Sequence, residues 1–143
     1  MTKSTNLPAS VLFVCTLNSI RSPMAEAMMK AKFGADVYVQ SCGLEAGETS
    51  DLMIAVMREK GIDTSTHMPR ALDDLGDTSF DMAIAFNDDA QAALQAVFDD
   101  SDTEIDCWPT PDPTQGAMDV RAMMDNFRAV RDVIEMRIEQ KFR

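Results

Sequence analysis

The chain has 143 residues, of which 45% are hydrophobic and 26% are charged, a composition that fits a soluble globular protein and excludes a fibrous or disordered one. This length predicts a single domain over residues 1–143 that buries roughly 70% of the surface of its unfolded chain. The formal net charge of −11 argues against nucleic-acid and anionic-membrane partners, because both are bound by clustered Lys and Arg.

The first predicted element is a buried strand over residues 10–15, SVLFVC, whose apolar residues do not alternate with polar ones. The four apolar residues before Cys15 are too few for a signal peptide or a membrane span, so we expect a cytoplasmic protein. A helix follows, with Ser22 at its N-cap, Pro23 at its first position and Gly34 as its end.

The remaining elements alternate between strands and helices. In chain order we predict a strand at 37–42, a helix at 50–60, a loop with one turn near 71–75, a strand at 80–86, a helix from Asn87, a short edge strand at 104–108 and a long amphipathic helix at 118–142. Residues 109–116, PTPDPTQG, form a loop because prolines at alternate positions prevent regular hydrogen bonding.

This alternation predicts an α/β fold with a parallel sheet and helices on both faces. Ligands of such sheets bind beyond the carboxyl ends of the strands. Cys15 and the 109–116 loop both follow predicted strands, and we therefore expect them at that edge.

The segment between Cys15 and the first helix has the composition of an anion site. Such a loop directs several backbone N–H groups into one small volume, and the helix dipole adds positive charge. Arg21 offers a planar guanidinium that matches two oxygens of a phosphate-like group. The same field favours the nucleophilic thiolate of Cys15, and Ser22 is placed to donate a hydrogen bond to it. The alternative is a core cysteine beside a surface arginine, which this grouping makes the weaker interpretation.

The other candidate side chains predict structural roles. Three irregularly spaced cysteines indicate reduced thiols and no disulfide framework, and a single histidine argues against a zinc site. We expect Cys42 and Cys107 to be core residues and His67 to be a loop residue.

The stretch from Cys15 to Ser22, CTLNSIRS, resembles the CX5R(S/T) phosphate loop of the low-molecular-weight protein tyrosine phosphatases and of the arsenate reductases that share their fold. The resemblance continues, in the same order, through SPMAEA, SCG at 41–43, FDMAIAF at 80–86 and the Asp112-Pro113 pair. Other cysteine phosphatases with this motif place it much later in a longer chain.

The resemblance implies a four-stranded parallel sheet in a flavodoxin-like three-layer sandwich, without metal or cofactor. It implies a phosphocysteine mechanism in which Cys15 is the nucleophile, Arg21 binds the phosphate and Asp112 is the general acid. The other phosphate-binding positions that it implies are Thr16, Leu17, Asn18, Ser19, Ile20 and Ser22.

The chain departs from both branches of the family. Leu17 stands where both usually have glycine, and Thr114 and Gln115 replace the tyrosines that wall the phosphatase slot, so Trp108 or Phe86 would have to supply an aromatic surface.

Reductases that relay a disulfide need two more cysteines after the third strand, and residues 87–106 contain none. Ile20 also replaces the second loop cysteine of some phosphatases.

Three functions follow from these features. The first is a phosphomonoester hydrolase acting on a phosphorylated protein or a small aryl phosphate. The second is an arsenate reductase in which Cys15 is the nucleophile and an external thiol completes the cycle. The third is a non-catalytic anion-binding module, which the joint presence of Cys15, Arg21, Ser22 and Asp112 disfavours.

Overall fold

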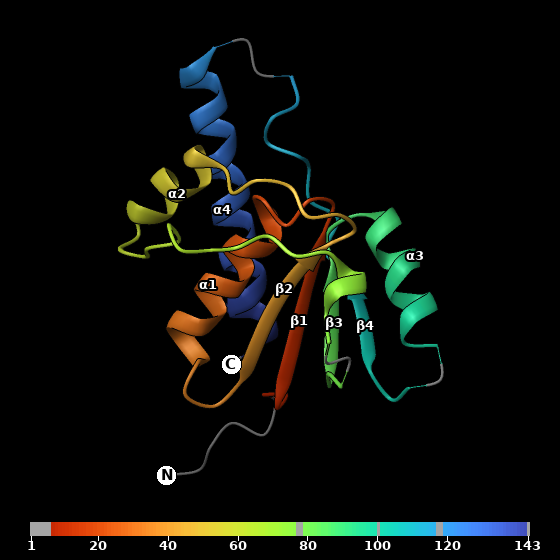
Figure 1. The fold of residues 1–143 in the computed structure, drawn as a ribbon. Helices are drawn as coiled ribbons and strands as arrows, with labels where there is room; N and C mark the ends of the chain where they lie inside the picture. The colour runs from red at the N-terminus through yellow and green to blue at the C-terminus, as the bar shows by residue number, and fades with distance from the viewer. Residues whose placement is uncertain (1–6, 77–78, 100, 117–118, 143) are drawn as a thin grey trace.

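A four-stranded parallel sheet forms the centre of the computed structural model, which describes residues 7–76, 79–99, 101–116 and 119–142 (Figure 1). Its strands lie in the order β2-β1-β3-β4. They are β1 (Ser10–Cys15), β2 (Tyr38–Gly43), β3 (Met82–Ala85) and β4 (Glu104–Cys107). The predicted parallel sheet and the edge position of the last strand are confirmed.

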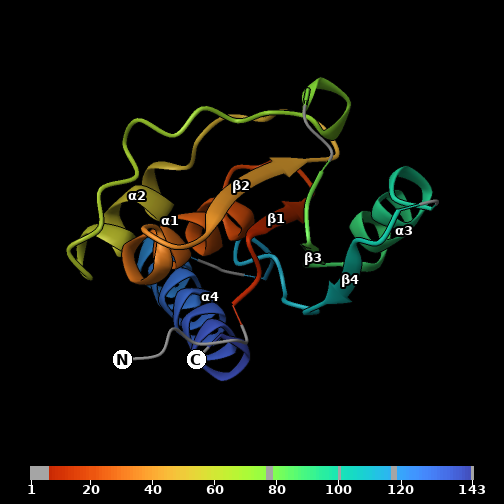
Figure 2. The same cartoon turned by 90° about the horizontal axis from the view of Figure 1, so that it is seen from below.

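Helices cover both faces of this sheet, as the alternating pattern predicts (Figure 2). One face packs against α1 (Arg21–Phe33), α2 (Asp51–Arg58) and α4 (Val120–Lys141), and the other packs against α3 (Asp88–Val97). A 3-10 turn, Leu72–Asp74, lies where one turn is predicted in the loop before β3. Within the described ranges, no helix is both long and apolar enough to cross a membrane.

The central strand β1 is buried on both faces, which explains its unbroken apolar sequence. Phe13 and Cys15 belong to the core beneath α1 and α4, whereas Leu12 and Val14 belong to the core beneath α3. This double burial fixes the register of β1, because a shift by one residue would exchange the two sets of side chains. The strand therefore holds Cys15 rigidly at its carboxyl end.

The start of α1 corrects one prediction. The helix begins at Arg21 with Ile20 at the N-cap, and no side chain caps it, so Ser22 is not the N-cap residue. The Ser22 hydroxyl lies instead 2.8 Å from the Cys15 sulfur and donates to the Cys42 carbonyl at 3.3 Å. The Ser22 side chain is therefore used for contacts within the loop and does not cap the helix.

Candidate active site

The loop of residues 16–20 turns its carbonyl groups outward, toward the segment that follows β2. Four backbone hydrogen bonds make this contact, from Leu44 to Cys15 (3.1 Å), Glu45 to Thr16 (3.0 Å), Gly47 to Leu17 (2.9 Å) and Ser50 to Ser19 (3.3 Å). In a trans peptide the next N–H points away from the carbonyl, so these bonds turn the loop amides inward. Among the described residues, the amides of residues 16–20 donate to no other group of the protein. The loop therefore forms a concave site, called the cradle below, lined by backbone N–H groups that have no acceptor among the described residues.

Asn18 gives the loop its shape. It has a φ of 56°, in the left-handed region that asparagine tolerates better than most residues. Leu17 therefore needs no positive φ, and its side chain is 44% exposed at the rim. Gly43 allows this arrangement, since a Cβ there would lie 2.6 Å from the Asn18 nitrogen.

The Asn18 side chain is fully buried behind the loop, where it joins three other segments. Its Nδ2 donates to Ser22 Oγ and to Ser41 Oγ, each at 2.9 Å, and its Oδ1 accepts from the Arg70 amide at 2.9 Å. The Asn18 carbonyl lies 2.9 Å from His67 Nε2. No sequence pattern predicts this network, because three of its four partners lie 23 to 52 residues away from Asn18.

Cys15 lies at the floor of the cradle and is only 2% exposed. Ser22 Oγ is its nearest polar neighbour, at 2.8 Å from Sγ, and either atom of this pair can donate. Ser22 Oγ accepts from Asn18 Nδ2, and its single hydrogen can point either to the Cys42 carbonyl at 3.3 Å or to the sulfur at 2.8 Å; a thiolate, being charged and closer, is the stronger acceptor. The network behind the loop therefore orients a donor toward the sulfur.

Arg21 closes the cradle from the side of the 109–116 loop. Its Nη1 donates to the Thr110 carbonyl at 2.7 Å, and its Nη2 contacts Thr16 Oγ1 at 3.5 Å. Thr16 Oγ1 also accepts from Asn87 Nδ2 at 2.9 Å. Arg21 as a whole is 8% exposed, and these contacts hold the orientation of its guanidinium.

Asp112 shares a cavity of about 100 Å³ with the loop, although almost a hundred residues separate it from Cys15. Its Oδ1 accepts from the Thr114 amide at 2.9 Å and from the Thr114 hydroxyl at 2.6 Å. The cavity is lined by Cys15, Thr16, Leu17, Ser19, Ile20, Arg21 and Asp112. Two residues that the sequence indicates as phosphate-binding, Asn18 and Ser22, lie behind the cavity and not on its wall.

The expectation that Trp108 or Phe86 supplies an aromatic surface is wrong. Both rings are buried in the core, where they pack against Phe13 at centroid distances of 6.0 and 6.1 Å. Phe86 directly follows β3 and Trp108 directly follows β4, where helices cover the sheet. Both rings therefore turn into the core and are not exposed at the active site. Tyr38 lies at the opposite, amino end of β2, stacked on Phe80.

Neither of the other two cysteines lines this cavity. Cys42 is buried in the core on the α3 side of the sheet, and burial raises the pKa of its thiol to about 12. Cys107 is half-buried on the same side, and desolvation raises its pKa as well. Within the described part of the chain, no group of three or more His, Cys, Asp and Glu side chains could hold a metal ion.

The sequence model of one protein family, described as low molecular weight phosphotyrosine protein phosphatase, matches residues 10–143. A glutaredoxin arsenate reductase from Synechocystis is 31% identical over 134 residues, covering 90% of this chain and 92% of the relative. An arsenate reductase from Staphylococcus aureus is 30% identical over 139 residues, covering 97% and 96%.

Solved structures of both kinds of enzyme share the fold. An arsenate reductase in the oxidized state superposes with a TM-score of 0.79 at 27% identity, covering 93% of this chain and 95% of that one. The YwlE arginine phosphatase from Geobacillus stearothermophilus superposes with a TM-score of 0.74 at 28% identity, covering 93% and 90%.

Proposed function

This chain belongs to the low molecular weight phosphotyrosine protein phosphatase family, and we propose that it is a cysteine-dependent phosphomonoester hydrolase. One observation carries the proposal: a thiol, a guanidinium and a carboxyl group from distant parts of the chain line one small cavity, beneath backbone amides that are free to bind an oxyanion. These are the groups that phosphoryl transfer through a covalent intermediate requires.

In the first step the Cys15 thiolate attacks phosphorus, and the bond from phosphorus to the ester oxygen breaks. The loop amides and Arg21 hold the equatorial oxygens, where negative charge gathers in the transition state. Asp112 gives its proton to the leaving alcohol. Because Oδ1 is hydrogen-bonded to Thr114, Oδ2 is the oxygen that releases this proton.

In the second step the Asp112 carboxylate takes a proton from water, whose oxygen attacks phosphorus. The sulfur–phosphorus bond breaks, inorganic phosphate forms, and Cys15 leaves as a thiolate. The Ser22 hydroxyl stabilises that thiolate at 2.8 Å, both as nucleophile and as leaving group.

The substrate that we propose is a phosphorylated protein or a small aryl phosphate. No aromatic side chain is among the cavity-lining residues of the described ranges, so selection for a phosphotyrosine ring by stacking is not expected. We further propose that residues 1–143 act as one cytoplasmic domain that needs no metal or cofactor.

Arsenate reduction is the second candidate, and the names of the curated relatives favour it. Here the Cys15 sulfur displaces water from arsenate, and an external thiol then attacks that sulfur. The electron pair of the sulfur–arsenic bond reduces arsenic(V) to arsenite, and a mixed disulfide remains for a second thiol to reduce. We propose an external thiol, because Cys42 and Cys107 pack in the core on the α3 side of the sheet and neither lines the cavity.

The two reactions are separated by measuring aryl phosphate hydrolysis and thiol-dependent arsenate reduction on one preparation. We expect hydrolysis that is abolished in Cys15→Ser and strongly reduced in Asp112→Asn. Arsenate turnover without hydrolysis would overturn the first proposal in favour of the second. Phosphate binding with neither activity would instead leave an anion-binding module.

A further inference from the structure

The hydroxyl group of Thr16 has no acceptor for its hydrogen within the described part of the chain. Its oxygen accepts two hydrogen bonds, from Asn87 Nδ2 at 2.9 Å and from Arg21 Nη2 at 3.5 Å. A hydroxyl oxygen has two lone pairs, so both are engaged and only the hydrogen remains to be paired. This hydroxyl donates no hydrogen bond to any described residue. Thr16 therefore keeps one unused donor.

The orientation of Asn87 fixes this arrangement. Asn87 lies just after β3, the neighbour of β1, and is the N-cap residue of α3. The side-chain atom that faces the Ala90 N–H, at 2.8 Å, must be the amide oxygen, because a backbone N–H can only donate. The amide nitrogen is thereby turned toward Thr16, and it too can only donate. The hydrogen of Thr16 therefore cannot be directed to Asn87.

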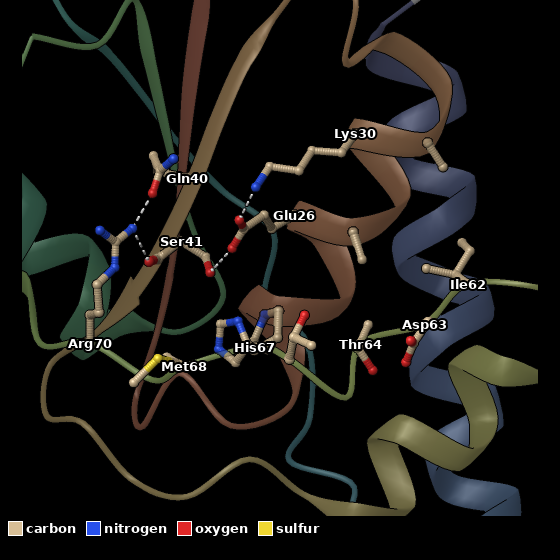
Figure 3. A pocket seen from close by; sticks show the side chains of 14 residues that line it. Glu26, Lys30, Gln40, Ser41, Ile62, Asp63, Thr64, His67, Met68 and Arg70 are labelled. Atoms are coloured by element: carbon tan, nitrogen blue, oxygen red, sulfur yellow. Dashed lines mark hydrogen bonds and ion pairs between the residues drawn. The ribbon is translucent and has the colours of Figure 1, made fainter.

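The serine hydroxyl groups around the phosphate loop differ from Thr16 in this respect. Ser41 is the most direct comparison, because its oxygen also accepts from an asparagine amide nitrogen, that of Asn18. Figure 3 shows that the Ser41 hydroxyl is directed to the Glu26 carboxylate, in the cavity between α1, β2 and the 62–70 segment. The Ser19 hydroxyl donates to a carbonyl of the loop itself at 3.4 Å. These hydrogens are used within the protein, whereas that of Thr16 is not.

Thr16 lies where a bound oxyanion can accept this hydrogen. It lines the cavity of about 100 Å³ together with Cys15 and Arg21. Its oxygen also contacts the Arg21 guanidinium, the group that is expected to hold the oxyanion. A hydrogen bond to an ionised oxygen is stronger than one to a neutral oxygen, so an oxyanion is a better acceptor for this hydroxyl than water.

We infer that the Thr16 hydroxyl is a further catalytic group, which donates a hydrogen bond to an equatorial oxygen of the bound oxyanion, and that Asn87 is the positioning residue that directs its hydrogen. This inference rests on the oxyanion site proposed above. It applies to both candidate reactions, because phosphate and arsenate present the same arrangement of oxygens. In hydrolysis the hydroxyl acts where negative charge gathers in the transition state, beside the loop amides and the guanidinium.

The affinity for inorganic phosphate, measured by calorimetry, tests the donor. Thr16→Val replaces the hydroxyl with a methyl group of similar size and is expected to weaken phosphate binding at least about 10-fold, the effect of losing a hydrogen bond to a charged group. Thr16→Ser keeps the hydroxyl and is expected to bind phosphate nearly as tightly as the parent chain. The matched control is Thr103→Val, which removes a hydroxyl that donates to the Phe80 carbonyl at the opposite, amino end of the sheet and leaves phosphate affinity unchanged.

A double-mutant cycle with Asn87→Asp separates donation to the oxyanion from support of Arg21. Aspartate caps a helix as well as asparagine does, but its carboxylate can only accept, so it takes the Thr16 hydrogen away from the cavity. The added charge weakens phosphate binding both with and without Thr16→Val, and this effect cancels in the cycle. We expect Thr16→Val to weaken phosphate binding at least about 10-fold in the parent chain and hardly at all in the Asn87→Asp background.

The inference is overturned if Thr16→Val binds phosphate as tightly as Thr16→Ser. It is also overturned if Thr16→Val has the same effect in both backgrounds, because the hydroxyl then acts by holding Arg21 and does not donate. Both results leave the proposed function standing, whereas a parent chain that does not bind phosphate overturns the proposed function and this inference together. If Asn87→Asp does not fold, the comparison of Thr16→Val with Thr16→Ser decides.

Discussion

Replacing Asn18 with alanine tests whether its side chain holds the phosphate loop in shape. The substitution removes three buried hydrogen bonds, to Ser22, Ser41 and Arg70. At about 1 kcal/mol each, these bonds contribute about 3 kcal/mol. Alanine at a φ of 56° costs about 1 kcal/mol more. The expected loss is therefore about 4 kcal/mol, a large part of the roughly 5–15 kcal/mol that stabilises a typical domain.

Urea unfolding measures this loss, and phosphate binding to the folded variant measures its effect on the site. The matched control is Asn126→Ala, which removes a single 3.3 Å hydrogen bond to the Pro113 carbonyl and is expected to cost less than about 1 kcal/mol. Ser41→Ala removes one of the three bonds from Asn18 and also the bond from Ser41 Oγ to Glu26, so its loss of stability is expected to lie between those of Asn126→Ala and Asn18→Ala. If Asn18→Ala costs no more than Asn126→Ala, or binds phosphate as tightly as the parent chain, Asn18 does not organise the loop.

Three further predictions concern the thiols and one ion pair. Iodoacetamide at pH 8 is expected to alkylate Cys15 and to spare Cys42, whose pKa burial raises to about 12; peptide mass spectrometry checks this, and rapid modification of Cys42 would contradict its placement. Ser22→Ala removes a hydrogen bond to a thiolate worth about 1.5–3 kcal/mol, so hydrolysis is expected to slow about 10- to 100-fold with phosphate affinity retained; an unchanged rate would exclude this donor role. Hydrogen bonds from Arg128 and, to a smaller extent, from Arg131 lower the pKa of Glu59 from 4.5 to about 2. The Glu59 carboxylate therefore stabilises the folded protein fully above about pH 4.5, and this stabilisation is lost as pH falls toward 2. Glu59→Gln should therefore destabilise the protein to urea at pH 7 and not at pH 2, and an equal effect at both would refute this linkage.

Local sequence patterns predict the parts of this protein that depend on local physics. The unbroken apolar run of β1 requires burial on two faces, and the stepped apolar residues of α4 require one buried stripe, so both elements lie where they are predicted. The grouping of Cys15 and Arg21 around a loop is local as well. The structure adds Asp112 to their cavity.

Contacts between distant segments are what the sequence does not predict. Ser22 has the residue type of a helix cap, yet its hydroxyl is taken by Cys15 and Cys42, which only the folded sheet brings near. Trp108 is an aromatic residue that could have lined a substrate site, yet its ring packs in the core against Phe13. Arg70 and His67 carry no motif, and their contacts with Asn18 exist only because the segment after α2 returns to the end of β2.

The burial of Cys15 bears on the choice between the two reactions. Both begin with an adduct on sulfur, and they differ in which atom is attacked next. Hydrolysis needs only a water molecule at phosphorus, beside Asp112 in the same cavity. Thiol exchange needs access to the sulfur itself, but Cys15 is only 2% exposed and lines a cavity of about 100 Å³ that the bound oxyanion would fill. In this conformation of the loop, water can complete the cycle, whereas an external thiol requires the loop to open first.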